Sequence, residues 1–306
     1  MRLLVIAPHL APDTAPTGVV VSALVAEMTA VGHQVHVVTS LPWYEKHAID
    51  PDWKSKGWRQ QGEFAGATVT RCYPFPAAKS NLLGRALGFI GFTALATLTS
   101  VFTRKRFDAV LAVSPPLTLG LAGWIAARRH RCPLIFNIQD VFPDVAIEVG
   151  ALTSGPAIRF FKTLERFCYR RAQAVTVLSD DLAANVTAKV GPSGPPVVVI
   201  PNFVDTTAIA PQDRATNYRT EHELGERTVV MYAGNLGHSQ SLNLMVEAAR
   251  LHQNRSDVVY VINGDGVAAA ELKTAAADLP NLTMVGYQSA DRLSEVLASA
   301  DLHLIL

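Results

Sequence analysis

The sequence predicts an α/β fold of two tandem, doubly wound domains, the second of them incomplete. First, 306 residues suit two domains of roughly 150 residues each. Second, short runs rich in Val and Ile alternate with longer helical stretches, which is typical of strand–helix–strand repeats. Third, the runs at 35–38 and 197–200 are almost wholly apolar. Such runs suit strands buried on both faces of a parallel sheet.

Each element follows from the spacing of apolar residues and from the turn residues that bound it. The predicted strands are 2–7, 34–39, 68–72, 108–113, 133–138, 174–178, 197–200, 228–233, 257–262, 282–285 and 301–306. The predicted helices are 18–32, 116–129, 154–171, 179–190, 239–254, 267–278 and 290–299. Ligands of open α/β sheets bind beyond the carboxyl ends of the strands, so the loops that follow strands are the candidate sites.

A polar stretch bounded by prolines divides the chain. Residues 201–226 contain Pro201, Pro211 and several charged residues, which predicts a linker and the entry of a second domain. The N-terminal domain then spans 1–200 and the partial C-terminal domain 227–306. The first 200 residues hold 20 Lys and Arg and 13 Asp and Glu, whereas the remainder hold 7 and 13. The resulting net charges of +7 and −6 suit a first domain that faces an anionic surface.

Composition excludes several classes of protein. With 49% hydrophobic and 17% charged residues, the chain is neither disordered nor a coiled coil. Its formal net charge of +1 gives no reason to expect nucleic acid as a partner. Cys72, Cys132 and Cys168 lie far apart, without CxxC or another metal-ligand spacing. We therefore expect no metal site and a reducing, cytoplasmic environment.

The loop after the first predicted strand leads to Gly18, where a helix begins. Glycine lets backbone approach a phosphate closely, and a helix N-terminus favours negative charge. Gly18 is therefore a candidate contact for a phosphate group. An ordinary strand–helix loop explains it equally well.

A second candidate follows the predicted strand at 133–138. Gln139 and Asp140 come directly after it, so their side chains should lie at the edge where the strands end. A carboxylate beside an amide can orient a sugar, and these two are the candidate catalytic residues. Asp144 lies further from the strand and is less favoured. The alternative is that Asp140 caps a turn and Asp144 is merely solvated.

Two glycine-rich turns in the second domain form a candidate diphosphate site, one after the strand at 228–233 and one after the strand at 257–262. The candidate binding residues are Gly234, Asn235 and Gln240 in the first turn and Gly264, Asp265 and Gly266 in the second. Backbone N–H groups at such turns can hold a diphosphate. Neither turn has the Gly-Lys-Ser/Thr ending of a Walker loop, and no GxGxxG follows the first strand.

One segment suggests contact with a membrane. Residues 86–102 carry no charge, and Arg104, Lys105 and Arg106 follow them. The stretch is short for a membrane span, which needs about 20 apolar residues. It is either a helix packed on the sheet or a helix lying partly in a membrane surface, with the basic cluster on lipid headgroups. A basic stripe on the predicted helix at 154–171 either adds to this surface or is a solvated face. Its members are Arg159, Lys162, Arg166 and Arg170.

Together these motifs resemble bacterial glycosyltransferases of family four, which have the GT-B fold. Within that family they resemble the branch that builds capsule, O-antigen and colanic-acid-type polysaccharides. The segments that carry the resemblance follow the family's order over nearly the whole chain. They are 139–144 (QDVFPD), 164–166 (LER), 169–172 (YRRA), 201–205 (PNFVD), 232–237 (YAGNLG) and 263–266 (NGDG).

The resemblance implies two Rossmann-like domains and a retaining transfer of a sugar from a nucleotide-sugar donor, with no metal or other cofactor required. The acceptor would be a lipid-linked glycan, and the protein would be peripheral on the inner face of the cell membrane. By family position, Gly18, Gly234 and Asn235 would lie near the donor phosphates. Gly264 to Gly266 would shape the donor pocket, and backbone near Tyr287 would reach the base.

Some residues depart from the pattern that this resemblance implies. Many members have Arg where Asn235 stands, Lys where Gln240 stands and His where Gln139 stands. The family also places two glutamates beyond the strand that 301–306 matches, so we expect the chain to be C-terminally truncated. Two alternatives remain: a catalytically inactive remnant that only binds nucleotide, and a sugar-nucleotide epimerase of the same architecture. The order of the motifs disfavours the epimerase.

Overall fold

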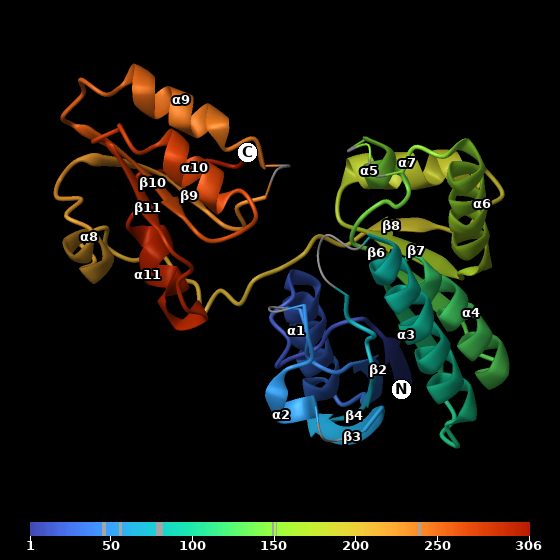
Figure 1. Cartoon of the computed structure of the whole chain (residues 1–306). Coiled ribbons are helices and arrows are strands. Elements are labelled where there is room, and N and C mark those ends of the chain that lie inside the picture. Colours follow the sequence, from blue (N-terminus) through green and yellow to red (C-terminus); the bar gives the residue numbers. More distant parts are fainter. Residues whose placement is uncertain (45–46, 55–56, 78–81, 149, 151, 238–239) are drawn as a thin grey trace. The chain divides into compact units, whose positions relative to one another are not determined.

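The computed structural model describes residues 1–44, 47–54, 57–77, 82–148, 150, 152–237 and 240–306. Within them the chain forms two compact units, Met1–Phe203 and Val204–Leu306, each with its own sheet (Figure 1). We refer to them as the N-terminal unit and the C-terminal unit. The predicted α/β fold with two successive sheets is confirmed.

The N-terminal unit is built on an eight-stranded sheet in the order β3-β4-β2-β1-β5-β6-β7-β8. The strands are β1 (Arg2–Ile6), β2 (Gln34–Ser40), β3 (Arg59–Phe64), β4 (Ala67–Cys72), β5 (Ala109–Ser114), β6 (Leu134–Ile138), β7 (Ala174–Val177) and β8 (Val197–Val199). All neighbours pair in parallel except β3 and β4, which are antiparallel. The order runs outward from β1 and β5 in both directions, which is the doubly wound arrangement.

Helices cover both faces of this sheet. They are α1 (Pro16–Ala30), α2 (Pro51–Lys54), α3 (Leu82–Phe102), α4 (Thr118–His130), α5 (Asp144–Glu148), α6 (Gly155–Arg171) and α7 (Asp180–Val190). α1 packs in one apolar cluster with β1 and β2 through Val21 and Val25. α3, α4, α6 and α7 share the other large cluster, which contains Phe136 and Tyr169. α3 packs on α4 and α4 packs on α6, so these three form one helix layer (Figure 1).

Both edges of the N-terminal sheet differ from the sequence prediction. β3 has no counterpart among the predicted strands, because an edge strand needs little apolar surface and most of its residues are polar. The run at 197–200 was expected to be buried on both faces. It forms the opposite edge strand, β8, where Val198 is 44% exposed. An apolar run therefore predicts a strand but not its place in the sheet.

The C-terminal unit has a four-stranded parallel sheet in the order β11-β10-β9-β12. Its elements are α8 (Asn217–Glu221), β9 (Thr228–Ala233), α9 (Asn243–Leu251), β10 (Val258–Asn263), α10 (Ala269–Ala275), β11 (Leu282–Val285), α11 (Leu293–Ala298) and β12 (Leu302–His303). α9 and α10 share one apolar cluster, and α8 and α11 share a second. Within the buried strand predicted at 301–306, a two-residue strand, β12, forms and pairs in parallel with β9. The predicted burial is wrong, because Leu302 is 57% exposed at the sheet edge.

α3 is the helix, among those the structure describes, that is long and apolar enough to cross a membrane. Its window Gly84–Phe102 has a mean hydropathy of 1.4, and 33% of it is buried. Core helices of soluble proteins meet the same criteria, but most of their surface is buried. Leu87, Ile90, Leu98 and Phe102 are exposed instead. Their spacing places them on one side of the helix.

Candidate active site

Polar side chains form a hydrogen-bonded chain across the carboxyl edge of the N-terminal sheet. Asn202, from the segment after β8, donates through Nδ2 to Gln139 Oε1 at 2.9 Å. Gln139 Nε2 donates to Asn137 Oδ1 at 2.7 Å. Asn137, on β6, donates through Nδ2 to Thr176 Oγ1 on β7 at 2.9 Å. Gln139 thus lies at the strand ends, where its amide is held from both sides.

Asp140 follows Gln139 and presents a free carboxylate. Among the residues that the structure describes, its side chain accepts no hydrogen bond and forms no ion pair. Although Asp140 is at the surface, the surrounding protein atoms desolvate its carboxyl and raise its pKa. A carboxylate with a raised pKa is a stronger proton acceptor, which suits a group that orients or deprotonates a hydroxyl.

The loop between β1 and α1 holds a buried His–Asp pair that the sequence analysis missed. His9 Nδ1 lies 2.7 Å from Asp13 Oδ2. The Tyr44 N–H donates to the other oxygen of Asp13 at 3.1 Å. A histidine and an aspartate four residues apart in a loop that follows a strand were the available signal.

Gly18 lies against this pair. A Cβ at position 18 would be 2.9 Å from the Cβ of His9. Glycine there allows the His9 loop to pack on α1, whether or not a phosphate binds. The contact of Gly18 with a donor stays a prediction.

Three motif residues of the N-terminal unit meet in a buried charge network. Lys189 Nζ lies 2.6 Å from Glu165 Oε1 and 2.7 Å from Asp144 Oδ2. The Tyr169 hydroxyl donates to Glu165 Oε1 at 3.0 Å. These contacts tie α5, α6 and α7 together. The alternative that Asp144 is merely solvated is therefore wrong, since it belongs to this network.

The two carboxyls of the network have shifted pKa values of opposite sign. Burial raises the pKa of Glu165, in spite of the hydrogen bond from Lys189. Partial burial also acts to raise the pKa of Asp144, but hydrogen bonds from Lys189 and Asn185 outweigh it and lower that pKa. Glu165 is therefore the group that most needs its lysine partner.

In the C-terminal unit the two glycine-rich turns interlock at the carboxyl edge of the sheet. The Leu236 N–H donates to the Asp265 carbonyl oxygen at 2.9 Å. A Cβ on Gly264 would collide with the carbonyl oxygen of Gly234, and one on Gly266 would collide with that of Leu236. Gly264 also has a φ of +151°, which other residues rarely adopt. Only glycine lets the two turns lie this close.

The other candidate donor-binding residues surround these turns. Asn235 is exposed beside Gly234, and Asp265 Oδ1 accepts from the Gly266 N–H at 2.7 Å. Gln240 Oε1 is buried and has no hydrogen-bond partner among the described residues. His238 and Ser239, which belong to the same turn, lie outside the described residues. Tyr287 follows β11 and is 77% exposed.

A buried tyrosine anchors the second turn, and the sequence analysis missed it. The Tyr218 hydroxyl, on α8, donates to Asn263 Oδ1 at 2.9 Å. Asn263 is the last residue of β10 and directly precedes Gly264. Burial raises the pKa of Tyr218, so the hydroxyl keeps its proton and remains a donor.

No group of three or more metal-ligating side chains occurs among the described residues. At the two turns, the N–H groups of Asn235 and Gly237, which make no hydrogen bond among the described residues, and the side-chain amides of Asn235 and Gln240 can hold an anion. None of the described residues of these two turns is a lysine or an arginine.

The chain matches two protein families and two curated relatives. A glycosyl transferase 4-like domain matches residues 17–202, and a glycosyl transferases group 1 domain matches residues 214–306. A protein of Escherichia coli K12 named as a colanic acid biosynthesis glycosyl transferase, WcaI, is 25% identical over 100% of this chain and 76% of its own length. The 2-deoxystreptamine glucosyltransferase of Streptomyces kanamyceticus is 24% identical over 81% of this chain and 66% of its own.

Solved structures support the same fold. Sucrose-phosphate synthase from Thermosynechococcus elongatus superposes with a TM-score of 0.74 at 14% identity, covering 100% of this chain and 75% of its own. HepE of Anabaena, solved with UDP-glucose, superposes with a TM-score of 0.64 at 15% identity, covering 99% of this chain and 73% of its own. WaaG, a glycosyltransferase involved in lipopolysaccharide biosynthesis, superposes with a TM-score of 0.65 at 14% identity, covering 99% of this chain and 74% of its own. The two sheets, their edge turns and both domain matches agree: the chain belongs to the glycosyl transferase 4-like family and is a glycosyltransferase of the GT-B fold.

Proposed function

We propose that the chain moves a sugar from a nucleoside diphosphate sugar to a lipid-linked glycan, with retention of configuration, in the synthesis of a surface polysaccharide. The similarity to the colanic acid and lipopolysaccharide glycosyltransferases supports the polysaccharide as product class. The UDP and UDP-glucose of the related structures support the donor class. Neither a metal ion nor another cofactor is part of the proposal.

The interlocked glycine turns of the C-terminal unit are the observation that carries this proposal. Gly264 and Gly266 let the second turn pack against the first at one sheet edge. The Leu236 and Gly266 N–H groups are bonded within the turns, whereas those of Asn235 and Gly237 make no hydrogen bond among the described residues. Preorganised N–H donors stabilise negative charge that develops on a leaving diphosphate. Because these turns lack a lysine or arginine among their described residues, the backbone and the amides of Asn235 and Gln240 take that role.

In the N-terminal unit we assign the acceptor to the carboxyl edge. Asp140 has a free carboxylate with a raised pKa, which suits it to hold the hydroxyl that attacks the donor sugar. Gln139 has both ends of its amide engaged by Asn202 and Asn137, so we assign it to shaping this edge. Asp140→Asn should therefore lower kcat more than it raises KM for the donor.

Donor binding tests the assignment directly. Gly234→Val should weaken binding of a nucleoside diphosphate sugar by at least about tenfold in calorimetry, because the added side chain blocks close approach to the turn. Asn235→Ala removes only an exposed side chain and should weaken binding without crowding the backbone. Gly62→Val, on edge strand β3 with open space around it, is the matched control. Unchanged affinity in both turn variants, with intact hydrogen exchange in β9, refutes the donor site.

We also propose that the protein works as a peripheral protein at the inner face of the cell membrane. The support is the exposed apolar side of α3 and the basic residues Arg104, Lys105 and Arg106 that follow it. Replacing these three with Gln should reduce association with anionic vesicles, most strongly at low salt. Equal sedimentation with neutral and anionic vesicles contradicts this location.

A further inference from the structure

We propose that the C-terminal ends of α4 and α6 form a phosphate-binding surface, and that its ligand is the headgroup phosphate of anionic membrane lipids. The choice of a lipid as the source of the phosphate rests on the proposed function, in which the protein works at a membrane. The surface consists of five arginines at the edge of the N-terminal sheet where the strands begin. They are Arg128, Arg131, Arg166, Arg170 and Arg171.

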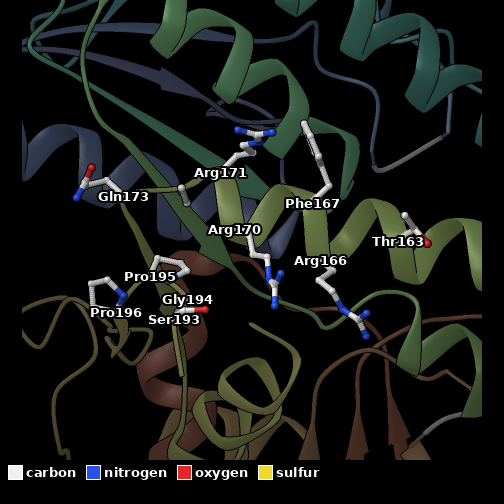
Figure 2. Close-up of a pocket in the computed structure, with 11 residues that line it drawn as sticks. Thr163, Arg166, Phe167, Arg170, Arg171, Gln173, Ser193, Gly194, Pro195 and Pro196 are labelled. Atoms are coloured by element: carbon white, nitrogen blue, oxygen red, sulfur yellow. The ribbon is translucent and has the colours of Figure 1, made fainter. Parts of the chain in front are cut away.

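Two adjoining hollows lie at this surface. Arg166, Arg170 and Arg171 line the first, which has a volume of about 730 Å³. Arg128 and Arg131 line the second, of about 750 Å³, together with Arg170 and Arg171 again. Figure 2 shows Arg166 and Arg170 extending to one side of α6 and Arg171 to the other. The α6–β7 turn therefore serves both hollows, and each is lined by at least three guanidinium groups.

Within the part of the chain that the structure describes, these arginines have no carboxylate partners. The ion pairs found among the described residues use other cations, such as Arg214, Arg250 and Arg255 of the C-terminal unit. None includes any of the five arginines of this surface. Like charges gathered without counter-charges repel one another, and an anionic partner relieves that repulsion.

Structural roles explain some of these side chains but not the cluster. Arg170 donates to the Val190 carbonyl oxygen at 3.0 Å, and Arg171 lies 5.5 Å above the Trp124 ring and 5.2 Å above that of Phe167. Cations at a helix C-terminus also interact favourably with the helix dipole. Two helix ends supply together about one negative charge, which is far less than five guanidinium groups carry.

The neighbouring helix favours a lipid over a soluble phosphate. His130 Nε2, at the end of α4, lies 2.9 Å from the Ser100 carbonyl oxygen near the end of α3, so the two helix ends are fastened together. Phe102 is 75% exposed and Leu98 is 52% exposed on that end of α3. The arginines need an anionic partner and the exposed apolar side of α3 needs an apolar one. A bilayer supplies both, since it has headgroup phosphates and an apolar interior. A soluble phosphate meets only the first.

Vesicle partition of the full chain tests the surface. The variant Arg128→Gln/Arg131→Gln/Arg166→Gln removes three charges and spares Arg170 and Arg171, which make the hydrogen bond to Val190 and two ring contacts. Of the three replaced side chains, Arg128 lies 5.8 Å above the Trp124 ring. The control Lys54→Gln/Arg255→Gln/Lys273→Gln removes the same number of positive charges away from this surface and from Arg104, Lys105 and Arg106. Wild type should sediment with vesicles that contain phosphatidylglycerol but not with phosphatidylcholine alone. The hollow variant should partition about 100-fold more weakly at low salt, and the control only slightly more weakly.

Several results overturn the proposal. If the triple-arginine variant and the control partition equally onto vesicles, these arginines do not form the lipid-binding site. Saturable binding of inorganic phosphate in calorimetry, lost in the hollow variant while vesicle binding is unchanged, makes the ligand a soluble anion. Tighter binding to an oligonucleotide than to vesicles makes it a nucleic acid. Donor affinity measured on the same variants should not change, so a failed donor site and a failed lipid site are told apart.

Discussion

Replacing Lys189 with Met should destabilise the N-terminal unit, because two carboxylates share its ammonium group. Glu165 Oε1 lies 2.6 Å and Asp144 Oδ2 lies 2.7 Å from Lys189 Nζ. The Glu165 side chain is 2% exposed, whereas that of Asp144 is 24% exposed and can be solvated. Met keeps most of the apolar stem of lysine, so the loss arises from charge and hydrogen bonding rather than from a cavity.

Glu165 sets the magnitude of this loss. Leaving one member of a buried ion pair without its partner costs about 3–5 kcal/mol. We expect about 3 kcal/mol, because the Tyr169 hydroxyl still donates to Glu165. Glu165 can escape the cost by binding a proton. Burial already raises its pKa, and the loss of Lys189 removes a hydrogen bond that opposes the rise. A carboxyl whose pKa is raised by folding destabilises fully above that raised pKa, and the cost vanishes only at the unfolded pKa of about 4.3. The penalty should therefore shrink as pH falls toward about 5.

Tryptophan fluorescence isolates this effect within the full chain. All four tryptophans, Trp43, Trp53, Trp58 and Trp124, belong to the N-terminal unit. Urea unfolding followed by fluorescence at pH 7 and near pH 5 gives the free energy of unfolding of that unit. Lys54→Met, on the exposed helix α2, is the control. A Lys189→Met loss no larger than the control, or a loss of equal size at both pH values, refutes the buried-charge argument.

Three further outcomes follow from the structure. Gly264→Ala drives a Cβ into neighbouring backbone and should abolish donor binding and speed hydrogen exchange of the second turn. Burial and two nearby cations lower the pKa of His36 to about 4. Between about pH 6.5 and pH 4 His36 is protonated in the unfolded chain but neutral in the folded unit. As pH falls through this window, the free energy of unfolding should decrease by up to about 3 kcal/mol. His36→Gln should flatten this part of the pH dependence of urea unfolding. Tyr218→Phe, which leaves Asn263 Oδ1 unpaired, should cost about 1–2 kcal/mol, measured by hydrogen exchange of 258–263.

Local apolar patterning predicts the buried centre of each sheet but not its edges. β2 was predicted at 34–39 and is found at Gln34–Ser40, because its residues are buried on both faces. β3 could not be found in this way. Its polar residues become a strand only through antiparallel pairing with β4, which is a tertiary contact. β8 has the opposite problem, since an apolar run of the same kind lies at the exposed edge.

The candidate site is predictable as a set of loops but not as a set of contacts. Gln139 and Asp140 lie at a sheet edge because they directly follow a strand, and a sequence reveals that position. The partners of Gln139 cannot be read in the same way, since Asn202 is 63 residues away. Likewise, 24 residues separate Glu165 from Lys189. Motif residues near a strand end are therefore of two kinds. Some keep a side chain that can bind a ligand, such as Asp140, and others already hydrogen-bond to distant side chains, such as Gln139.

The strand–helix–strand topology determines where the basic residues of the first 200 residues lie on the surface. In a strand–helix–strand repeat each crossover helix ends beside the edge where the next strand begins. Basic last turns therefore collect at that edge, as Arg128 and Arg129 of α4 do with Arg170 and Arg171 of α6. Residues that follow strands collect at the opposite edge, where Asp140 lies. The same connectivity thus separates the acidic candidate for catalysis from the arginines proposed to bind lipid. A residue's place before or after a strand predicts which of the two chemistries it joins.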